Sequence, residues 1–347
     1  MRPSYWLIPG VLICAAAALA SQTGPVTGPV LGFVFDHSVG GVRPILGIPG
    51  ASLFGEPVGL RIDTSRAAIS NAGGYVLGTE AETGRVMLYR ELAPAAPGIA
   101  LEEAGPAPDR IVLSPTGSAA ALLYAERQAI QVFAGLPASP QFRGEISLFG
   151  LLGPLLAIAV ADDGRSVLAA AREGEGAESV MLLSPGMTPR LLGTAGRVAA
   201  AAFFAGRPDA VLADTSAEAV VWIRDVQGAA EFVSLHGEFA KAAAVQATED
   251  GRKILVAGEG TVTTVNLEGG EQVVSRCECS ISALDRLRGD SVFRVTELSA
   301  GPTWLFDAGS PAARFVFVPA RATAFARGIS AERLVPRPTA PAKGGTR

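Results

Sequence analysis

Hydrophobic residues occur along most of the chain in short runs, each followed by a polar or glycine-containing turn. Residues 241–279 show the pattern most clearly: AAAVQATEDG forms an apolar run with its turn, followed by RKILVAGE, TVTTVNLEGG and EQVVSRC. Short runs rich in Val, Ala and Leu that glycine turns separate predict β-strands and leave little room for helices. We therefore expect a unit of four antiparallel strands, labelled A to D in chain order.

This unit recurs along the chain. The glycines of the turn between strands A and B are Gly74, Gly117, Gly164, Gly206, Gly251 and Gly289. Their spacings, 38 to 47 residues, match one four-stranded blade of a β-propeller. A lone four-stranded sheet has two apolar faces to cover, and blades stacked around an axis cover both faces. The repeat predicts an all-β propeller.

The two ends of the chain predict a seventh blade. Residues 30–48 are assigned to strands C and D because LGFVFD aligns with TWLFDAG, and residues 322–335 are assigned to strands A and B. A blade built from both segments would close the ring and hide two sheet edges. We therefore expect a seven-bladed β-propeller over residues 21–337, with a last blade made of N-terminal strands C and D and C-terminal strands A and B. A disordered tail is expected at 338–347.

Two stretches of the repeat resemble a known family. The strings IAVADDGRSVLAAA followed by ESVMLLSPG, and IVLSPTGSAAALLYAE followed by AIQVF, are similar to the repeats of YVTN-type or lactonase-like β-propellers of exported bacterial proteins, relatives of the WD-repeat class. The chain departs from that family where Ala or Leu mostly replaces the tyrosine of the second strand. The resemblance implies the fold but little about activity, because this architecture hosts lactonases, lyases, redox-cofactor enzymes and binding proteins.

Residues 1–20 predict a secretory signal peptide. Arg2 precedes an apolar stretch, and Ala18-Leu19-Ala20 forms an A-x-A cleavage site. The stretch is shorter than the ~20 residues that span a bilayer, so we expect a periplasmic or secreted protein without a membrane span, in preference to an uncleaved anchor. Cleavage removes one of 29 basic residues, which leaves 28 against 33 acidic ones and a net charge of −5. That balance argues against a nucleic-acid partner.

Export would leave Cys277 and Cys279 in a compartment where thiols oxidise. Residues i and i+2 of a strand point to the same face, so the two sulfurs can meet. A structural disulfide, two unbonded thiols, and redox or metal chemistry all stay open. No other cysteine of the exported chain and no nearby histidine supplies further metal ligands, so we expect no metal site.

A carboxylate recurs at the end of strand B. These residues are Glu80, Glu126, Glu173, Asp214, Glu259 and Glu297. In a propeller they would form an acidic rim on the face that carries the B–C and D–A connections, and such a rim attracts cationic ligands. The alternative is a set of solvated strand ends that block edge association.

Catalytic motifs are sparse. The chain has 2 histidines, and His236 lies in a D–A connection on the same predicted face. A solvated loop histidine and a catalytic one both fit, although no partner that would orient a base is evident. We expect a non-catalytic module without a cofactor that binds a protein or small molecule. The alternative is a lactonase-like hydrolase or lyase that uses the B–C/D–A face and His236.

Overall fold

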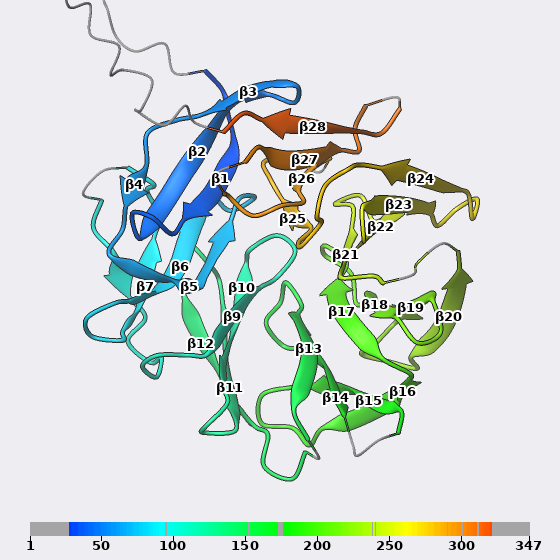
Figure 1. The fold of residues 1–347 in the computed structure, drawn as a ribbon. Helices are drawn as coiled ribbons and strands as arrows, with labels where there is room; N and C mark the ends of the chain where they lie inside the picture. Colours follow the sequence, from blue (N-terminus) through cyan, green and yellow to red (C-terminus); the bar gives the residue numbers. More distant parts are fainter. Residues whose placement is uncertain are drawn as a thin grey trace, which may run out of the picture.

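The computed structural model describes residues 28–320 except 94–95, 152, 173–175, 238, 240, 290, 300 and 311. The predicted signal peptide, the C-terminal strands at 322–335 and the tail lie outside these residues. All regular elements of the described part are strands, which form seven four-stranded antiparallel sheets around a common axis (Figure 1). The chain is a seven-bladed β-propeller, as the repeat predicted. No helix long and apolar enough to cross a membrane occurs among the described residues.

The first four blades cover residues 30–195. The strands of blade 1 are β1 (Val30–Asp36), β2 (Gly41–Ile48), β3 (Ala51–Phe54) and β4 (Val58–Gly59). Those of blade 2 are β5 (Ile62–Ser70), β6 (Tyr75–Glu80), β7 (Val86–Tyr89) and β8 (Ile99–Ala100). Those of blade 3 are β9 (Arg110–Leu113), β10 (Ala119–Tyr124), β11 (Ala129–Ala134) and β12 (Gln141–Ser147). Those of blade 4 are β13 (Leu155–Val160), β14 (Val167–Arg172), β15 (Glu178–Leu183) and β16 (Arg190–Ala195).

The last three blades cover residues 198–318. The strands of blade 5 are β17 (Val198–Phe203), β18 (Ala210–Asp214), β19 (Ala219–Arg224) and β20 (Glu231–His236). Those of blade 6 are β21 (Ala244–Ala247), β22 (Lys253–Gly258), β23 (Thr261–Asn266) and β24 (Gln272–Arg276). Those of blade 7 are β25 (Asp285–Arg286), β26 (Val292–Arg294), β27 (Thr303–Asp307) and β28 (Arg314–Val318).

Within each blade the first strand lies nearest the axis, and in blades 2 to 7 the others follow outward in chain order (Figure 1). The six predicted turn glycines join strands A and B, and each has a φ between 63° and 82°. Residues with a side chain rarely adopt this left-handed conformation. The repeat of glycines in the sequence therefore reflects a backbone requirement of one turn in each blade.

The predicted composition of the closing blade is wrong for its N-terminal part. β1 and β2 are the inner strands A and B of blade 1, and the outer strands β3 and β4 come from the same N-terminal segment. A buried inner strand and a buried third strand have the same apolar pattern, so LGFVFD fits both positions. The short β4 pairs with β2 at Gly41, where a side chain would lie 2.0 Å from the Val58 carbonyl oxygen. Strands as short as β3 and β4 leave little pattern in the sequence.

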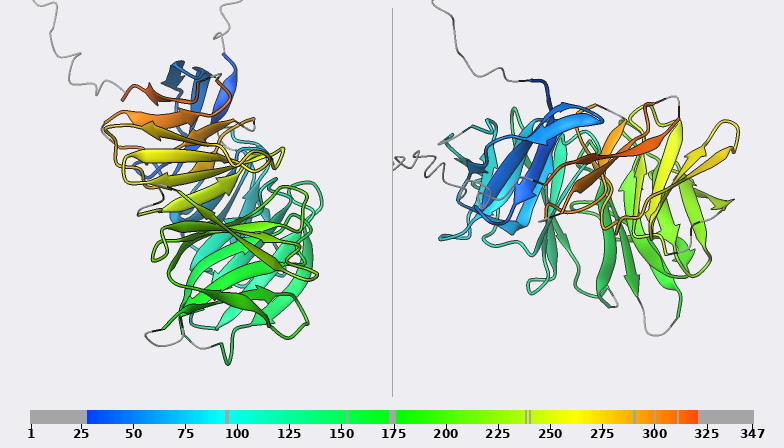
Figure 2. Two further views of the ribbon diagram at one scale, coloured as in Figure 1. Left: turned by 90° about the vertical axis from the view of Figure 1, so that its right-hand side faces the viewer. Right: turned by 45° about the horizontal axis from the view of Figure 1, so that its top comes forward.

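Seven hydrophobic clusters hold the blades together, one at each interface between neighbours. The cluster between blades 3 and 4 has 14 buried members, among them Ala121, Val132 and Ala169. The cluster between blades 7 and 1 has 7, including Leu31 and Leu287. There β28 lies beside β3, the outer strand of the first blade (Figure 2). Side-chain packing, not strand exchange, joins blades 7 and 1 in the described chain.

Hydrogen bonds near the A–B turns add a second, polar connection between the blades. The Asn71 side chain accepts from the Phe33 N–H (2.6 Å) and donates to the Arg286 carbonyl (3.2 Å), which links blades 1, 2 and 7. The Asp162 carboxylate accepts from the N–H groups of Thr116 (2.9 Å) and Gly206 (2.8 Å), which links blades 3, 4 and 5.

Three further hydrogen bonds cover the remaining interfaces. The Tyr75 hydroxyl donates to the Gly117 carbonyl (2.6 Å) between blades 2 and 3. The Arg207 guanidinium donates to the Gly251 carbonyl (3.2 Å) between blades 5 and 6, and the Arg286 guanidinium donates to the Ala247 carbonyl between blades 6 and 7. Polar contacts near the A–B turns therefore connect all seven blades.

Candidate functional site

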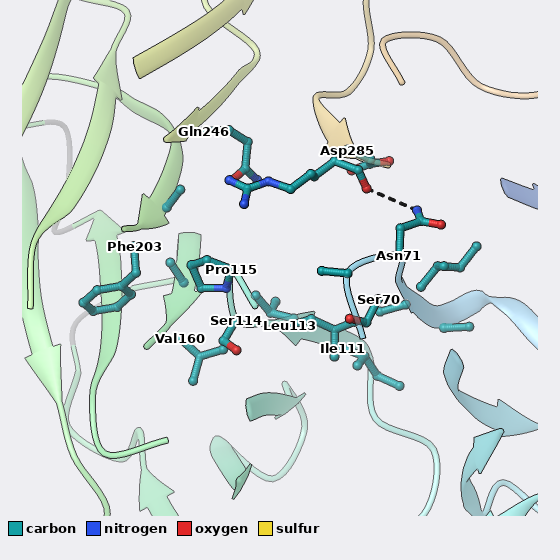
Figure 3. A pocket seen from close by; sticks show the side chains of 18 of the residues that line it. Ser70, Asn71, Ile111, Leu113, Ser114, Pro115, Val160, Phe203, Gln246 and Asp285 are labelled. Carbon is teal, nitrogen blue, oxygen red and sulfur yellow. Dashed lines mark hydrogen bonds between the residues drawn. The ribbon is translucent and has the colours of Figure 1, made fainter. Parts of the chain in front are cut away.

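A cavity of about 450 Å³ lies on the propeller axis. The inner strands of all seven blades line it, together with the last residue of β26. Because strand A of every blade runs in the same direction, the cavity lies between the B–C/D–A face and the A–B face. Figure 3 shows its side chains.

Part of the cavity wall is apolar, although polar atoms make up more of its accessible surface. Its partly exposed apolar side chains include Phe33, Phe35, Ile69, Val112 and Leu113. The wall also includes buried apolar residues of blades 4 and 5, such as Val160 and Phe203 (Figure 3). Apolar surface that water reaches gains free energy when a ligand covers it, at about 25 cal/mol per Å². This part of the wall can therefore bind the apolar portion of a ligand.

Blades 6 and 7 contribute polar side chains to the cavity. Arg294 is buried and forms ion pairs with Asp285 and with Glu297, whose carboxylate lies 2.6 Å from its guanidinium. Burial opposes the charge of Arg294, but the two carboxylates outweigh it and raise the pKa of this guanidinium. Arg286 donates to the Ala247 carbonyl. The cations on this side of the cavity already have protein partners.

Arg110 of blade 3 differs from Arg286 and Arg294 in its surroundings. It is the first residue of β9 and lines the cavity, and its side chain has neither a hydrogen bond nor an ion pair with any described residue. Solvent reaches the residue, yet the surrounding protein removes enough water to lower the pKa of the guanidinium. An arginine stays charged at neutral pH despite such a shift. The cavity thus contains a cation that the described protein leaves uncompensated.

The repeat shows that the fold does not require an arginine at this position. Arg110 pairs with Leu123 of strand B, and blades 4, 5 and 6 have Ala157, Ala200 and Ala244 at the same step of their A–B ladders, whereas blade 2 has a longer bulge next to that step. Gln246 stands five residues before its turn glycine, where blades 2 to 5 have Ile69, Val112, Ala159 and Ala201. The Gln246 side chain faces the cavity (Figure 3) and has no hydrogen bond to a described residue. Two positions that need only a small or apolar side chain thus carry polar groups.

The cavity lining is positively charged, although the whole chain is negative. Three arginines line the cavity against two carboxylates, Asp285 in the lining and Glu297 paired with Arg294, whereas the formal net charge of the chain is −4. A low-dielectric cavity with an excess of cationic groups concentrates field lines and attracts anions. We did not predict this positively charged cavity from the sequence. The available signal was a polar residue at a position of the repeat where other blades have small residues.

The carboxylates predicted at the ends of strand B do not line this cavity, as far as the described residues show. Their position at the end of the second strand places them toward the B–C turns, and Glu173 lies outside the described residues. Thr83 donates to Glu80 (2.5 Å), Lys241 pairs with Glu259, and Arg294 pairs with Glu297. Glu126 is exposed and has no such partner in the described chain. An acidic rim that acts as one site stays a prediction.

The Asp214 side chain stabilises the backbone around a B–C turn. Its buried carboxylate accepts from the N–H groups of Gly196 (2.6 Å), Arg197 (3.0 Å) and Ser216 (3.0 Å). Burial opposes ionisation, but these backbone donors and the Ser216 hydroxyl outweigh it and lower the pKa of Asp214 to about 2. The side chain therefore ties the B–C turn of blade 5 to the preceding D–A connection.

His236 lies away from the axis. It is the last residue of β20, the outermost strand of blade 5, and its ring is exposed. The residue does not line the central cavity, and its carbonyl accepts a hydrogen bond from the Gln272 amide (2.6 Å). The structure therefore does not bring His236 together with the polar groups of the cavity.

The two cysteines lie in a second, shallow groove. Cys277 and Cys279 follow β24 and are joined by a disulfide, with Cα atoms 5.3 Å apart. The groove has a volume of about 490 Å³ and also contains Lys241 and Glu259. No group of three or more His, Cys, Asp or Glu side chains arranged to hold a metal ion occurs in the described part of the chain.

Comparisons with known proteins agree on the fold. No protein-family model matches the chain, and no curated protein matches it. A functionally unknown protein from Desulfotomaculum acetoxidans DSM 771 is similar in structure, with a TM-score of 0.55 and 13% identity over 84% of this chain and 99% of that one. A candidate 6-phosphogluconolactonase from Bacteroides fragilis NCTC 9343 is similar at a TM-score of 0.55 and 13% identity, over 84% and 95%. Likeness at this identity shows the propeller fold alone.

Proposed function

We propose that this chain is an exported, non-catalytic propeller of the YVTN or lactonase-like type whose central cavity binds a small anionic ligand with an apolar part. The observation that carries the proposal is Arg110, an arginine of the cavity without a partner in the described chain, at a position where blades 4, 5 and 6 have Ala. A charged group that the fold neither needs nor satisfies is available for a ligand.

The chemistry of the ligand follows from the two kinds of wall. A guanidinium binds carboxylate, sulfonate or phosphate through charge-assisted hydrogen bonds, and these are strongest where water is scarce. The Gln246 amide offers a further donor and acceptor, and the apolar side chains of blades 1 to 5 cover a hydrocarbon or aromatic portion. A small organic anion matches both walls.

The acidic rim favours a different ligand but has weaker support. Two of its carboxylates, Glu259 and Glu297, pair with cations, and the oxygens of Asp214 accept from backbone N–H groups. Ion pairs compensate two of the five described carboxylates, and the other three, Glu80, Glu126 and Asp214, stand on different blades and do not line the central cavity. The cavity is therefore the better candidate for the binding site.

A fluorescent probe with the required chemistry tests the proposal. 8-Anilinonaphthalene-1-sulfonate combines aromatic rings with a sulfonate, and its fluorescence rises when it leaves water. We expect saturable binding by the exported protein and a Kd at least about tenfold weaker for Arg110→Leu, because a hydrogen bond to a charged group contributes about 1.5–3 kcal/mol. Thermal unfolding of both proteins should coincide, which separates lost binding from lost structure.

Arg197→Leu is the matched control. Arg197 is exposed, lies in a D–A connection of the same face and does not line the cavity. Its loss should change the Kd of the probe less than twofold. Equal weakening by both substitutions would show that the probe responds to overall charge, and the cavity would then be the wrong site.

The lactonase-like alternative requires both a substrate-binding cation and a catalytic base in the same cavity. Arg110 would bind the anionic group of a substrate such as 6-phosphogluconolactone, and hydrolysis would need a base beside it. Asp285, a carboxylate of the cavity lining, is engaged by Arg294. We expect lactone hydrolysis no faster than the spontaneous reaction. Turnover that Arg110→Leu abolishes would favour the enzyme over the binding module.

A further inference from the structure

The groove around the two cysteines lies at the B–C turn of blade 6, beside the D–A connections before and after that blade and apart from the central cavity. It is lined by Lys241, Glu259, Gly260, Cys277, Glu278 and Cys279, with Ala243, Ser280 and Ile281 at its edges. Both cysteines are half-buried, so a reagent in the groove reaches them. The Cys277 N–H donates to the Gly260 carbonyl (2.9 Å), which fixes the first cysteine against the turn between β22 and β23.

The bond between these cysteines contributes little to the fold. The two residues are separated by 2 positions in one D–A connection, so the bond links no separate elements. A disulfide stabilises a protein mainly by closing a loop in the unfolded chain, and this loop is almost as short as a loop can be. The hydrophobic cluster between blades 6 and 7 and the Arg286 hydrogen bond already join these two blades.

The charges of the groove are placed to act on an approaching thiol. Lys241 and Glu259 form an exposed ion pair, and Lys241 adopts a left-handed backbone conformation with a φ of 55°. Glu278 stands between the cysteines, is exposed and has no hydrogen bond or ion pair with the rest of the described chain. Arg276 precedes Cys277 but does not line the groove. The lining therefore carries one uncompensated negative charge.

We infer that the Cys277–Cys279 pair is a thiol–disulfide exchange site, open to a thiol that carries positive charge nearby, in a small molecule or in another protein. Accessible disulfides that contribute little to stability are those that take part in exchange. The negative charge of Glu278 repels anionic thiols and attracts cationic ones.

The reaction is a balanced exchange with two equivalents of thiol. The thiolate of the first equivalent attacks one sulfur of the pair, a bond forms between the two, and the Cys277–Cys279 bond breaks to release the other cysteine as thiolate. A second thiolate then attacks the mixed disulfide, which releases the oxidised reagent and the second cysteine thiolate. The two protons lost by the reagent thiols go to the two cysteines, which are reduced while the reagent is oxidised.

Reduction of the full-length folded protein by two small thiols tests the inference. The oxidised protein is mixed with cysteamine, a cation, or with 3-mercaptopropionate, an anion, at equal thiolate concentration, and the reaction is stopped with an alkylating agent and followed by mass. We expect both to reduce the bond without unfolding, with a change in Tm below about 2 °C. Because the two thiolates differ in intrinsic nucleophilicity, the quantity compared is the ratio of the cysteamine rate to the 3-mercaptopropionate rate in the unchanged protein and in a variant without the charge of Glu278.

Two variants separate the charge from the site. Glu278→Gln should lower the ratio of the cysteamine rate to the 3-mercaptopropionate rate at least about threefold, because the intrinsic nucleophilicities of the two thiolates cancel in this comparison. Cys279→Ser, treated with the disulfide cystamine, should form one mixed disulfide per chain and release one cysteamine, and replacing both cysteines by Ser should leave the Tm unchanged. Three results would overturn the inference: a bond that resists reduction until the protein unfolds, a large fall in Tm on reduction, or a pair that stays as free thiols in oxidised glutathione. Binding of the anionic probe in the cavity should not respond to these substitutions.

Discussion

Two arginines of the central cavity differ in what surrounds them. Arg294 of blade 7 is 8% exposed and pairs with two carboxylates, Asp285 and Glu297. Arg110 of blade 3 lines the same cavity, is exposed to it and has no partner in the described chain. A buried charge persists in a folded protein only if an opposite charge or hydrogen bonds compensate it, whereas a charge that water reaches needs no protein partner and is available to a ligand.

The comparison separates groups that hold the ring from groups that are available for binding. Asn71, Asp162 and Arg294 use their polar atoms within the protein, each across more than one element. The side chains of Arg110 and Gln246 form no hydrogen bond or ion pair with the described chain. Substitutions at the first kind of residue should therefore lower the free energy of unfolding, and substitutions at the second kind should change only binding.

The largest effect is expected at the junction of blades 1, 2 and 7. Asn71→Ala removes a buried side chain that accepts from Phe33 and donates to the Arg286 carbonyl, and it leaves the Phe33 N–H without its partner. We expect a loss of about 3 kcal/mol in the free energy of unfolding, measured with denaturant. Asn266→Ala, at the last residue of β23, is the control and should cost less than about 1 kcal/mol. Equal losses would contradict a special role of Asn71 in closing the ring.

A smaller loss in the free energy of unfolding is expected when Arg294 is replaced. Arg294→Leu removes both ion pairs, but Asp285 and Glu297 are each 53% exposed in their side chains and can regain water. The expected loss is therefore about 2 kcal/mol, less than for a fully buried pair. Arg127→Leu breaks the exposed ion pair with Glu145 and should cost less than about 1 kcal/mol. A stability change at Arg294 no larger than at Arg127 would remove the distinction between compensated and open charges.

A pH effect of similar or smaller size is expected at Asp214. Its pKa is about 2 in the folded protein, below the ordinary value of 3.8, so its ionised form stabilises the fold above about pH 4. That contribution, on the order of 1–2 kcal/mol, is lost as the pH falls from 4 toward 2. Asp214→Asn should be less stable at pH 7 and should lose less stability over this range. Glu126→Gln, which changes an exposed carboxylate, should follow the unchanged protein.

The number of blades and the A–B turns could be predicted from the sequence because each blade repeats one backbone requirement. Gly117 and Gly206 adopt the left-handed conformation that the turn needs, and any other residue there would be strained. The place of residues 30–48 could not be predicted in the same way. Both a first strand and a third strand are buried on two faces, so the apolar pattern of β1 does not distinguish them.

The candidate site was predictable only in part. The carboxylates at the ends of strand B recur in the sequence, but their partners come from other segments, as Lys241 does for Glu259. Whether such a charge is open or compensated therefore depends on tertiary contacts. Arg110 left a local signal, since the copies in blades 4, 5 and 6 have Ala at the same place, although only the fold shows that this position faces the axis.

The smallest effect on stability and the most direct test concern Arg110. 8-Anilinonaphthalene-1-sulfonate and N-phenyl-1-naphthylamine have the same rings, and only the first carries a sulfonate. The unchanged protein should bind the sulfonate with a Kd at least about tenfold lower than that of the neutral compound. Arg110→Leu should abolish this preference, retain binding of the neutral compound and unfold within about 0.5 kcal/mol of the unchanged protein. An undiminished preference for the sulfonate in Arg110→Leu would contradict the proposed anion site.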